Sequence, residues 1–295
     1  MLEALLRFIS YTNESEEGVA IRSGGGYRGL PVSRLGGDLA HFLRDDSALA
    51  QLAETLAGAP EFALSDVTLL PPVVRPGKIL CIGLNYRDHS KESGFEPPTY
   101  PAVFARFANS LVAHGDPLVR PDASDLLDYE CELAVVIGRG GRHLGEDEAL
   151  DHVAGYSLFN DGSVRDFQLK SDQWTMGKTF DHTGAFGPEL VTRDELPPGA
   201  RGLRIRTVLN GETMQEANTE DMIFGVARLV AILSEAMTLS PGDVIVTGTP
   251  GGVGALRKPQ VWLKPGDECT VEIDQLGSLT NPVVQEAPRH LVPTT

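Results

Sequence analysis

The residues best suited to chemistry lie in the run Asp128-Tyr129-Glu130-Cys131-Glu132, which leads into the apolar residues Leu133 to Ile137. Because side chains alternate along a strand, Glu130 and Glu132 share one face and Cys131 takes the other. Two ionised carboxylates on one face of a buried strand repel each other unless they protonate or share a cation. Oxygen ligands favour a hard ion, Mg²⁺ or Mn²⁺ before Ca²⁺. Alternatively, both glutamates lie at the solvated start of the strand, and the residues fit that interpretation equally well.

A third carboxylate, Asp161, follows the next apolar run, Val153 to Phe159, in the sequence Asn160-Asp161-Gly162. A strand that ends in a turn lets such a side chain point into a cleft. Arg165 and Gln168 come four and seven residues later, so a helical turn beginning at Asp161 would carry one anion and two hydrogen-bond donors on one face. The alternative is a capped helix whose polar face is solvated.

A histidine and an acid stand three residues apart in a short polar segment that Asn85 could cap and Gly94 could end. On a helical turn, His89 and Glu92 are neighbours. Glu92 could then hold one ring nitrogen and leave the other free to take a proton from water, which describes a general-base pair. The alternative is a surface helix with a salt bridge.

Three glycine-containing segments invite a nucleotide-loop interpretation. The first, Gly138-Arg139-Gly140-Gly141, has His143 where the dinucleotide motif needs its third glycine, and the second, Gly177-Lys178-Thr179, has Asp172 where a phosphate loop needs its first. Neither motif is therefore complete. The third, Thr247 to Gly254, could approach a ligand with its backbone or could simply be a connection that needs positive φ values.

The composition is that of a compact globular protein: 295 residues, 41% hydrophobic and 22% charged. The formal net charge of −16 makes nucleic acid and anionic membrane surfaces poor partners, because both repel an acidic protein. The start of the chain lacks the basic and long apolar segments of a leader, and no apolar run is long enough to span a membrane. Three widely spaced cysteines, Cys81, Cys131 and Cys269, suit reduced thiols. We therefore expect a cytoplasmic protein.

Turn residues and periodicity predict two parts with a boundary near residue 75. The first, residues 1–75, is a small N-terminal α/β module with a helix from about Leu39 to Leu56. The second, residues 76–295, opens with a strand at Ile79 to Ile82 and is dominated by strands.

Two local signals refine the larger part. Asn210-Gly211 predicts a hairpin after the run Leu203 to Leu209, which implies antiparallel pairing. After the possible caps Asn218 and Thr219, apolar residues from Met222 to Met237 recur at helical spacing and predict one long helix.

Five short segments between residues 76 and 284 together resemble, in order, the motifs of the fumarylacetoacetate hydrolase family. They are Gly83-Leu84-Asn85-Tyr86 with His89 and Glu92, Asp128-Tyr129-Glu130-Cys131-Glu132, Asn160-Asp161 with Arg165 and Gln168, Gly177-Lys178-Thr179-Phe180, and Thr247-Gly248-Thr249-Pro250. The resemblance implies an α+β, β-dominated fold with a mixed β-roll catalytic domain. It also implies a homodimer.

The resemblance implies a metal site and a catalytic pair. Glu130, Glu132 and Asp161 are similar to the family's ligands for Mg²⁺ or Mn²⁺, with Ca²⁺ possible in a crystal. His89 and Glu92 resemble its water-activating dyad on a mobile lid.

Five further residues resemble groups that contact the substrate. Lys178 and Gln168 are similar to donors to a developing oxyanion. Arg165, Thr249 and Gly248 resemble substrate-binding residues, with the Thr249 hydroxyl and nearby backbone holding a carboxylate.

The implied activity is metal-dependent hydrolysis of a carbon–carbon bond in a 2,4-dioxo acid such as an acylpyruvate. The products are a 2-oxo acid and a carboxylic acid, as in aromatic compound catabolism. A decarboxylase or tautomerase on the same scaffold is one alternative, and a non-catalytic, metal-stabilised binding module is another.

This sequence departs from the family pattern in two places. Phe104-Ala105-Arg106-Phe107 carries an arginine where many relatives have a lysine followed by proline. No counterpart is found for the fourth carboxylate ligand that some relatives draw from an earlier segment. The first 75 residues match no motif that we can interpret.

Overall fold

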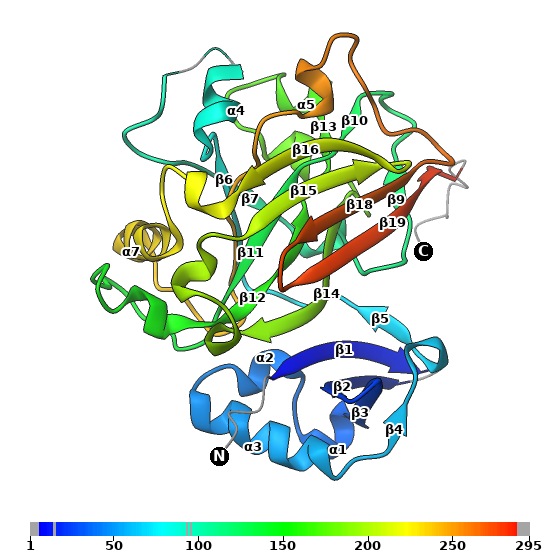
Figure 1. The fold of residues 1–295 in the computed structure, drawn as a ribbon, viewed down its shortest axis with the longest axis vertical. Helices are drawn as coiled ribbons and strands as arrows, with labels where there is room; N and C mark the ends of the chain where they lie inside the picture. The colour runs from blue at the N-terminus through cyan, green and yellow to red at the C-terminus, as the bar shows by residue number, and fades with distance from the viewer. Residues whose placement is uncertain (1–5, 14–15, 93, 95, 288–295) are drawn as a thin grey trace, which may run out of the picture.

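The structure is a computed structural model that describes residues 6–13, 16–92, 94 and 96–287. Strands dominate it, as predicted, and within the described residues they form one twelve-stranded sheet, one five-stranded sheet and one strand pair. The two large sheets are mixed, which confirms the predicted fold class (Figure 1). No helix among these residues is long and apolar enough to cross a membrane.

The large sheet runs in the order β4-β3-β2-β1-β14-β12-β11-β17-β6-β7, with β5 paired to β1 and β8 to β14. Its strands are β1 (Arg7–Asn13), β2 (Glu16–Ser23), β3 (Gly26–Pro31), β4 (Glu61–Phe62), β5 (Thr68–Leu70), β6 (Ile79–Gly83), β7 (Ala102–Arg106), β8 (Leu111–Val112), β11 (Cys131–Ile137), β12 (Val153–Asn160), β14 (Gly184–Thr192) and β17 (Val244–Val246).

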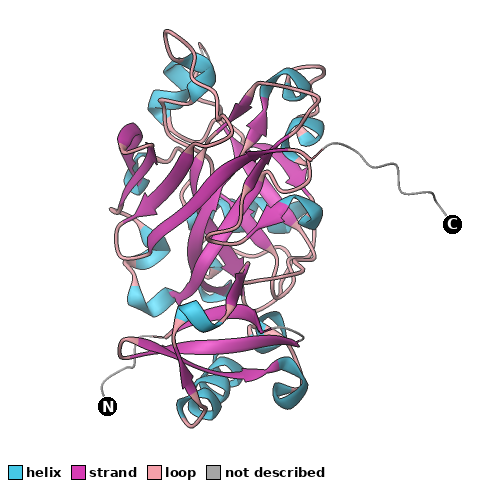
Figure 2. Cartoon of the chain, turned by 90° about the vertical axis from the view of Figure 1, so that its right-hand side faces the viewer, coloured by secondary structure: helices cyan, strands magenta, loops and turns pink. Residues whose placement is uncertain are grey.

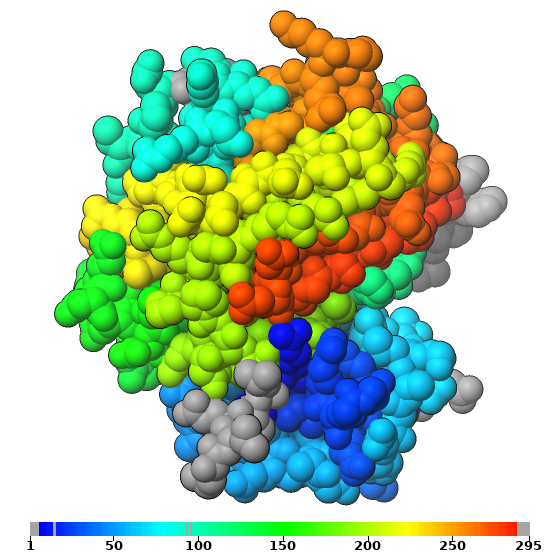
Figure 3. Space-filling view, in the orientation of Figure 1, coloured from blue at the N-terminus to red at the C-terminus, as the bar shows by residue number. Residues whose placement is uncertain are grey.

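The five-stranded sheet packs across the larger one and lies at the front of the molecule in Figures 1 and 3. Its order is β16 (Glu212–Asn218), β15 (Arg204–Leu209), β18 (Glu268–Ile273), β19 (Gly277–Gln285) and β9 (Leu118–Arg120). β15 and β16 form the hairpin predicted at Asn210-Gly211, with Leu209 opposite Glu212. The separate pair is β10 (Leu127–Asp128) with β13 (Ser163–Val164).

The central strand β11 is buried on both faces. Leu133 and Val135 belong to the hydrophobic core that includes the five-stranded sheet. Ala134 and Val136 belong to a second core, which the N-terminal helices cover on the other side. With neighbours β12 and β17 on both edges, this strand has no wet side, so any charge on it must find a partner inside the protein.

The N-terminal strands extend the large sheet, because β1 pairs with β14 in the register Arg7 opposite Val191. They form the lower end of the molecule in Figure 2, with helices α1 (Val32–Leu35), α2 (Leu39–Phe42) and α3 (Asp46–Ala57) packed against them. The boundary near residue 75 stays a prediction.

The predicted helix at 39–56 is two helices. The carboxylate of Asp45 accepts a hydrogen bond from the backbone N–H of Ala48 at 2.7 Å and starts α3 afresh after the last turn of α2.

The long helix predicted from Met222 is also shorter than expected, and this part of the prediction is wrong. Helix α7 covers Val226–Ala236, whereas Ile223 and Phe224 lie outside it and bond with Asn85. The Ile223 N–H donates to the Asn85 carbonyl oxygen at 2.7 Å, and the Phe224 N–H donates to Asn85 Oδ1 at 2.8 Å. Asn218 does act as a cap, but of the short 3₁₀ turn Thr219–Asp221.

The remaining helices are short: α4 (Arg87–Glu92), α5 (Arg165–Gln168) and α6 (Thr175–Lys178). Single 3₁₀ turns span Leu64–Asp66, Ala108–Ser110, Ala149–His152, Arg193–Glu195, Pro198–Ala200 and Gly254–Leu256. Helices α4, α5 and α6 carry most of the remaining predicted site residues, at one end of strands β6, β11 and β12.

Candidate metal centre and active site

The three predicted acidic ligands meet where β11 begins and β12 ends. These strands are antiparallel neighbours with Cys131 opposite Asn160, which places Glu130 and Glu132 beside Asp161. The Asp161 N–H donates to the Glu130 carbonyl oxygen at 2.9 Å. One carboxylate oxygen from each acid lies within 4.8 Å of the other two. The register of the two strands therefore brings Asp161 to Glu130 and Glu132, about thirty residues earlier in the sequence.

All three acids are buried. Glu130, Glu132 and Asp161 are 4%, 2% and 0% exposed, which excludes the interpretation that the glutamates lie at a solvated strand end. Asp161 does not begin a helical turn, so the single helical face considered for Asp161, Arg165 and Gln168 is not formed. Asp161 precedes β13, and α5 begins only at Arg165, because backbone pairing to β10 extends the chain in between.

Glu130 lies between two cations. Lys178 Nζ is 2.5 Å from its Oε2, and Arg165 Nη2 is 2.7 Å from its Oε1. Burial alone would raise the pKa of Glu130, but these two cations outweigh it and lower the pKa to about 2. Burial likewise opposes the charge on Lys178, but Asp161 and Glu130 raise its pKa above the usual value, so the side chain is an ammonium ion.

Asp161 binds a cation at each carboxylate oxygen. Lys178 Nζ lies 2.6 Å from Oδ2, and Arg106 Nη1 lies 2.6 Å from Oδ1. Arg106 is 1% exposed. The sequence marked it as a departure from the family pattern, but gave no sign that it contacts a predicted metal ligand.

Glu132 forms no ion pair within the described part of the chain. Its Oε2 accepts one hydrogen bond, from the Gly248 N–H at 2.5 Å. Burial raises its pKa well above the usual value, and the nearby charges of Asp161 and Glu130 raise it further. The cluster thus contains one buried carboxylate that lacks a positive partner.

The cluster fits a hard divalent cation. It offers only carboxylate oxygens as ligands, and Glu132, the carboxyl group without a positive partner, lies next to Glu130 and Asp161. The residues present therefore match the kind of ion that the sequence predicted.

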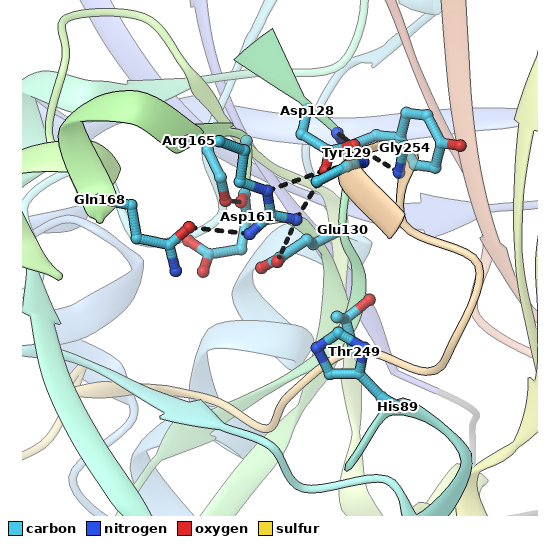
Figure 4. A network of polar contacts seen from close by, with 12 residues as sticks. His89, Asp128, Tyr129, Glu130, Asp161, Arg165, Gln168, Thr249 and Gly254 are labelled. Atoms are coloured by element: carbon cyan, nitrogen blue, oxygen red, sulfur yellow. Dashed lines mark hydrogen bonds and ion pairs between the residues drawn. The ribbon is translucent and has the colours of Figure 1, made fainter. Parts of the chain in front are cut away.

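Arg165 connects this cluster to a neighbouring loop, as Figure 4 shows. Its Nε and Nη2 both lie 2.8 Å from Asp128 Oδ2, and its Nη1 donates to Gln168 Oε1 at 2.9 Å. Asp128 in turn accepts from the N–H groups of Gly254 and Ala255 at 2.8 and 2.9 Å. Sequence reasoning assigned Asp128 no role. Asp128 precedes Glu130 by two residues, and residues two apart on a strand share a face, so this spacing could have indicated that Asp128 lies near the site.

His89 and Glu92 lie on α4 at the edge of the site, but they are not hydrogen bonded. The distance from His89 Nδ1 to Glu92 Oε2 is 3.8 Å, and His89 Nδ1 has no hydrogen-bond partner among the described residues. Glu92 Oε2 instead accepts from the Gly252 N–H at 2.9 Å. The nearby His89 imidazole, together with this N–H, lowers the pKa of Glu92 despite burial. Asn85 does not cap this helix, since its amide donates to the carbonyl oxygens of Phe224 and Thr247.

The loop at 247–254 is both a tight connection and a wall of the site. Gly248 has a φ of 100°, and a Cβ there would lie 2.7 Å from Asn85 Cβ. The Thr249 hydroxyl donates to the Cys131 carbonyl oxygen at 3.0 Å and accepts from Gln215 Nε2 at 2.8 Å. Gln215 was missed because it lies on β16, far from any motif.

These residues surround one cavity of about 220 Å³. Its polar lining consists of His89, Glu130, Glu132, Arg165, Gln168, Lys178 and Thr249. The apolar lining includes Phe104 and Trp174, whose rings are 5.5 Å apart and edge to face. The predicted residues outside this lining, Asp161, Glu92 and Gly248, contact members of it.

Comparison with known proteins identifies the class of this scaffold. A family model described as fumarylacetoacetate (FAA) hydrolase C-terminal matches residues 78–284. An oxaloacetate tautomerase of Xenopus laevis, fahd2, which is mitochondrial, is 44% identical over 251 residues, covering 83% of this chain and 78% of that protein. The fold and the sequence thus define an enzyme scaffold of the FAA hydrolase type.

Solved structures agree. A putative HpcE protein from Mycobacterium smegmatis has a TM-score of 0.84 and 35% identity, covering 95% of this chain and 100% of that one. Maleylpyruvate hydrolase from Sphingobium sp. SYK-6, solved with manganese(II) and pyruvate, has a TM-score of 0.78 and 28% identity, covering 95% and 99%. The chain belongs to the fumarylacetoacetate hydrolase family, as its motifs indicated.

Proposed function

We propose that this chain is a metal-dependent enzyme that interconverts the keto and enol forms of a 2-oxo acid such as oxaloacetate. The observation that carries the proposal is a buried acidic cluster with one unbalanced carboxylate, opening on a cavity that also contains a histidine and a buried ammonium group. The 44% identity to an oxaloacetate tautomerase supports this choice of reaction.

Glu130, Glu132 and Asp161 would hold Mg²⁺ or Mn²⁺. When bound, such an ion supplies positive charge opposite the carboxylate and the 2-oxo oxygen of the substrate. The cations of the site serve the same end, since Arg165 and Lys178 both line the cavity.

The side chains of the cavity would do the proton chemistry and the binding. His89 would take a proton from carbon 3 of the keto form, while the oxygen on carbon 2 gains one, so that no atom is lost or added overall. Lys178 would stabilise the negative charge that develops on that oxygen, with Gln168 as a second donor. Arg165 would orient the substrate carboxylate. The Gly248 N–H and the Thr249 hydroxyl hydrogen already bond with Glu132 and with the Cys131 carbonyl oxygen, so these two residues would shape the wall beside the substrate.

The hydrolysis predicted from sequence is the second candidate, and the position of His89 and Glu92 beside the cavity supports it. In this reaction a water gives its proton to His89 as its oxygen attacks the distal carbonyl carbon. The bond between carbons 3 and 4 then breaks, and its electron pair stays on carbon 3, which is protonated to give the 2-oxo acid. Maleylpyruvate hydrolase, similar in fold, bears the name of such an activity.

An assay of chelator-stripped protein tests the proposal. We expect the protein to speed the loss of ultraviolet absorbance of enol-oxaloacetate when Mg²⁺ or Mn²⁺ is added back, and not with chelator present. No metal-dependent acceleration would refute the tautomerase proposal. With an acylpyruvate, two acids indicate hydrolysis and CO₂ indicates decarboxylation. Thermal stabilisation by Mg²⁺ with no turnover would indicate a binding module.

Glu92→Gln separates the two reactions. A water-activating pair needs the Glu92 carboxylate to orient His89, so hydrolysis should fall by about 100-fold in this variant. Tautomerisation needs one proton carrier and no water held for attack, so we expect it to change less than about tenfold. The measurement is kcat with both substrates.

Asp88→Asn is the matched control for that variant. Asp88 lies on the same helix and also binds the 247–254 loop, through the Gly251 N–H at 3.2 Å. Its other carboxylate oxygen accepts from the backbone N–H of His89 at 2.8 Å, not from the imidazole ring. An equal loss in both variants would mean that Glu92 acts only by anchoring the helix.

We further propose a homodimer that works in the cytoplasm on small 2-oxo acids of aromatic compound catabolism. Size-exclusion chromatography with light scattering tests the dimer.

A further inference from the structure

We propose that Arg106 is a positioning residue that fixes Asp161 through one carboxylate oxygen, so that the ion meets only the other oxygen, which Lys178 also contacts, and that it thereby favours Mg²⁺ and Mn²⁺ over Ca²⁺. The inference rests on the proposed metal site, but not on which reaction that site performs.

Arg106 is held on every side of its guanidinium group. Its Nη1 donates to Asp161 Oδ1 at 2.6 Å and to the Gly162 carbonyl oxygen at 3.1 Å. Its Nη2 donates to Thr183 Oγ1 at 2.7 Å, and its Nε donates to Ser110 Oγ at 2.8 Å. All of these contacts are buried, so neither the arginine nor Asp161 can exchange its partner for water.

The two hydroxyl groups act as fixed acceptors. Ser110 Oγ donates its own hydrogen to the Phe107 carbonyl oxygen at 2.6 Å. Thr183 Oγ1 donates to the Phe180 carbonyl oxygen at 2.8 Å. Each hydroxyl therefore turns a lone pair toward Arg106 and cannot rotate away without losing a bond.

The position also requires the flat shape of an arginine. A Cβ added at Gly184 would lie 2.5 to 2.6 Å from the guanidinium atoms, so the group lies directly against backbone. A lysine ammonium is a single point charge on a flexible stem, and it cannot bridge Ser110, Thr183 and Asp161 at once.

The other two candidate ligands are restrained in the same way. Glu130 Oε1 is bound by Arg165 Nη2 at 2.7 Å, and Glu132 Oε2 is bound by the Gly248 N–H at 2.5 Å. In each of the three carboxylates, a protein donor thus binds one oxygen. The other oxygens of Glu130 and Asp161 both accept from Lys178, so a bound ion would share these two oxygens with the ammonium group or displace it.

The oxygen that each carboxylate turns away from its arginine or backbone donor sets the preferred ion. Mg²⁺ requires near-octahedral coordination by single oxygens at short range, whereas Ca²⁺ takes six to eight oxygens and often binds both oxygens of one carboxylate. Donors that occupy the second oxygen deny Ca²⁺ this extra coordination. Arg106 supplies that donor to Asp161.

The test measures metal binding by Arg106→Lys. In chelator-stripped protein, we expect the Kd for Mn²⁺, measured by calorimetry and by the paramagnetic resonance signal of free Mn²⁺, to rise about 10- to 100-fold. The Kd for Ca²⁺ should rise less, so that the ratio of the Ca²⁺ and Mn²⁺ constants falls by about tenfold. An unchanged Kd for Mn²⁺ and an unchanged ratio in a folded variant would overturn the inference.

Two further variants complete the design. Arg204→Lys is the control for the chemical change. Arg204 is half-exposed on β15 and pairs with Asp274 at 3.6 Å, so this variant should bind Mn²⁺ as the wild type does. If Arg106→Lys does not fold, Ser110→Ala combined with Thr183→Val loosens the arginine without removing it. That double variant should bind Mn²⁺ more weakly than the wild type, and wild-type affinity would again overturn the inference.

The outcomes separate this inference from the proposed function. If the wild type binds neither Mg²⁺ nor Mn²⁺, the metal-dependent function fails, and the role of Arg106 fails with it. If the wild type binds Mn²⁺ and Arg106→Lys binds it equally well, only the role of Arg106 fails.

Discussion

Glu132→Gln should cost the protein its metal and yet raise its melting temperature in the presence of chelator. A glutamine keeps the shape of the side chain but removes a buried carboxyl group that is costly to ionise, as its raised pKa shows. This group has a single hydrogen bond, from Gly248, and no ion pair among the described residues. Metal affinity should fall by more than about 100-fold, beyond the range typical of residues that only support a ligand.

The gain in stability has the same cause as the loss of affinity. A buried, poorly satisfied polar group costs roughly 1–3 kcal/mol, and charged groups cost more. For a chain of this size, about 1 kcal/mol corresponds to roughly 2–4 °C in melting temperature. We therefore expect metal-free Glu132→Gln to melt a few degrees above metal-free wild type, by calorimetry.

Glu130→Gln is the matched comparison, with the same chemical change two residues away. Glu130 pairs with Lys178 and Arg165, so its removal leaves buried cations with too little negative charge. Breaking such a pair costs about 3–5 kcal/mol, and this variant should melt lower than wild type with or without metal. A lower melting temperature for metal-free Glu132→Gln would contradict our description of its charge.

His89→Ala should leave metal binding intact and remove most of the turnover. We expect kcat to drop by about 10²- to 10⁴-fold, the usual contribution of a positioned proton-transfer group. The imidazole lines the cavity, and its Nδ1 forms no hydrogen bond within the described residues, so its loss should leave the binding of Mn²⁺ by the acids unchanged.

The measurements are kcat with saturating metal and the Kd for Mn²⁺ in the same preparation. His41→Ala, at an exposed position on the N-terminal helix α2, is the control and should behave as wild type. Unchanged turnover in His89→Ala would remove this residue from the mechanism.

Much of the catalytic part could be predicted from local patterns. Alternation identified β11 and the shared face of Glu130 and Glu132, and Asn210-Gly211 identified the β15–β16 hairpin. These features depend on neighbours in sequence. The residues near Ile223 have helical spacing too, but backbone bonds to Asn85, 138 residues away, draw them out of the helix.

The missed site residues have the same explanation. Arg106 and Gln215 act through tertiary contacts, and no nearby spacing indicates their partners. Two carboxylates on one face of a buried strand suggested a metal site beside a solvated alternative, and the family resemblance assigned Glu130, Glu132 and Asp161 to it. The pattern showed that the charges need a counterpart, but not that Lys178 and Arg165 both serve Glu130, leaving Glu132 unpaired.

The pairing of β1 with β14 has a practical consequence for anyone who wants to isolate the catalytic part. A shortened chain that begins near residue 75 would leave β14 with bare backbone donors and acceptors along its outer rim, and would uncover apolar side chains such as Leu190. An unpaired sheet edge of this kind can pair with strands of other molecules. The N-terminal strands therefore also protect the catalytic part against intermolecular strand pairing and aggregation.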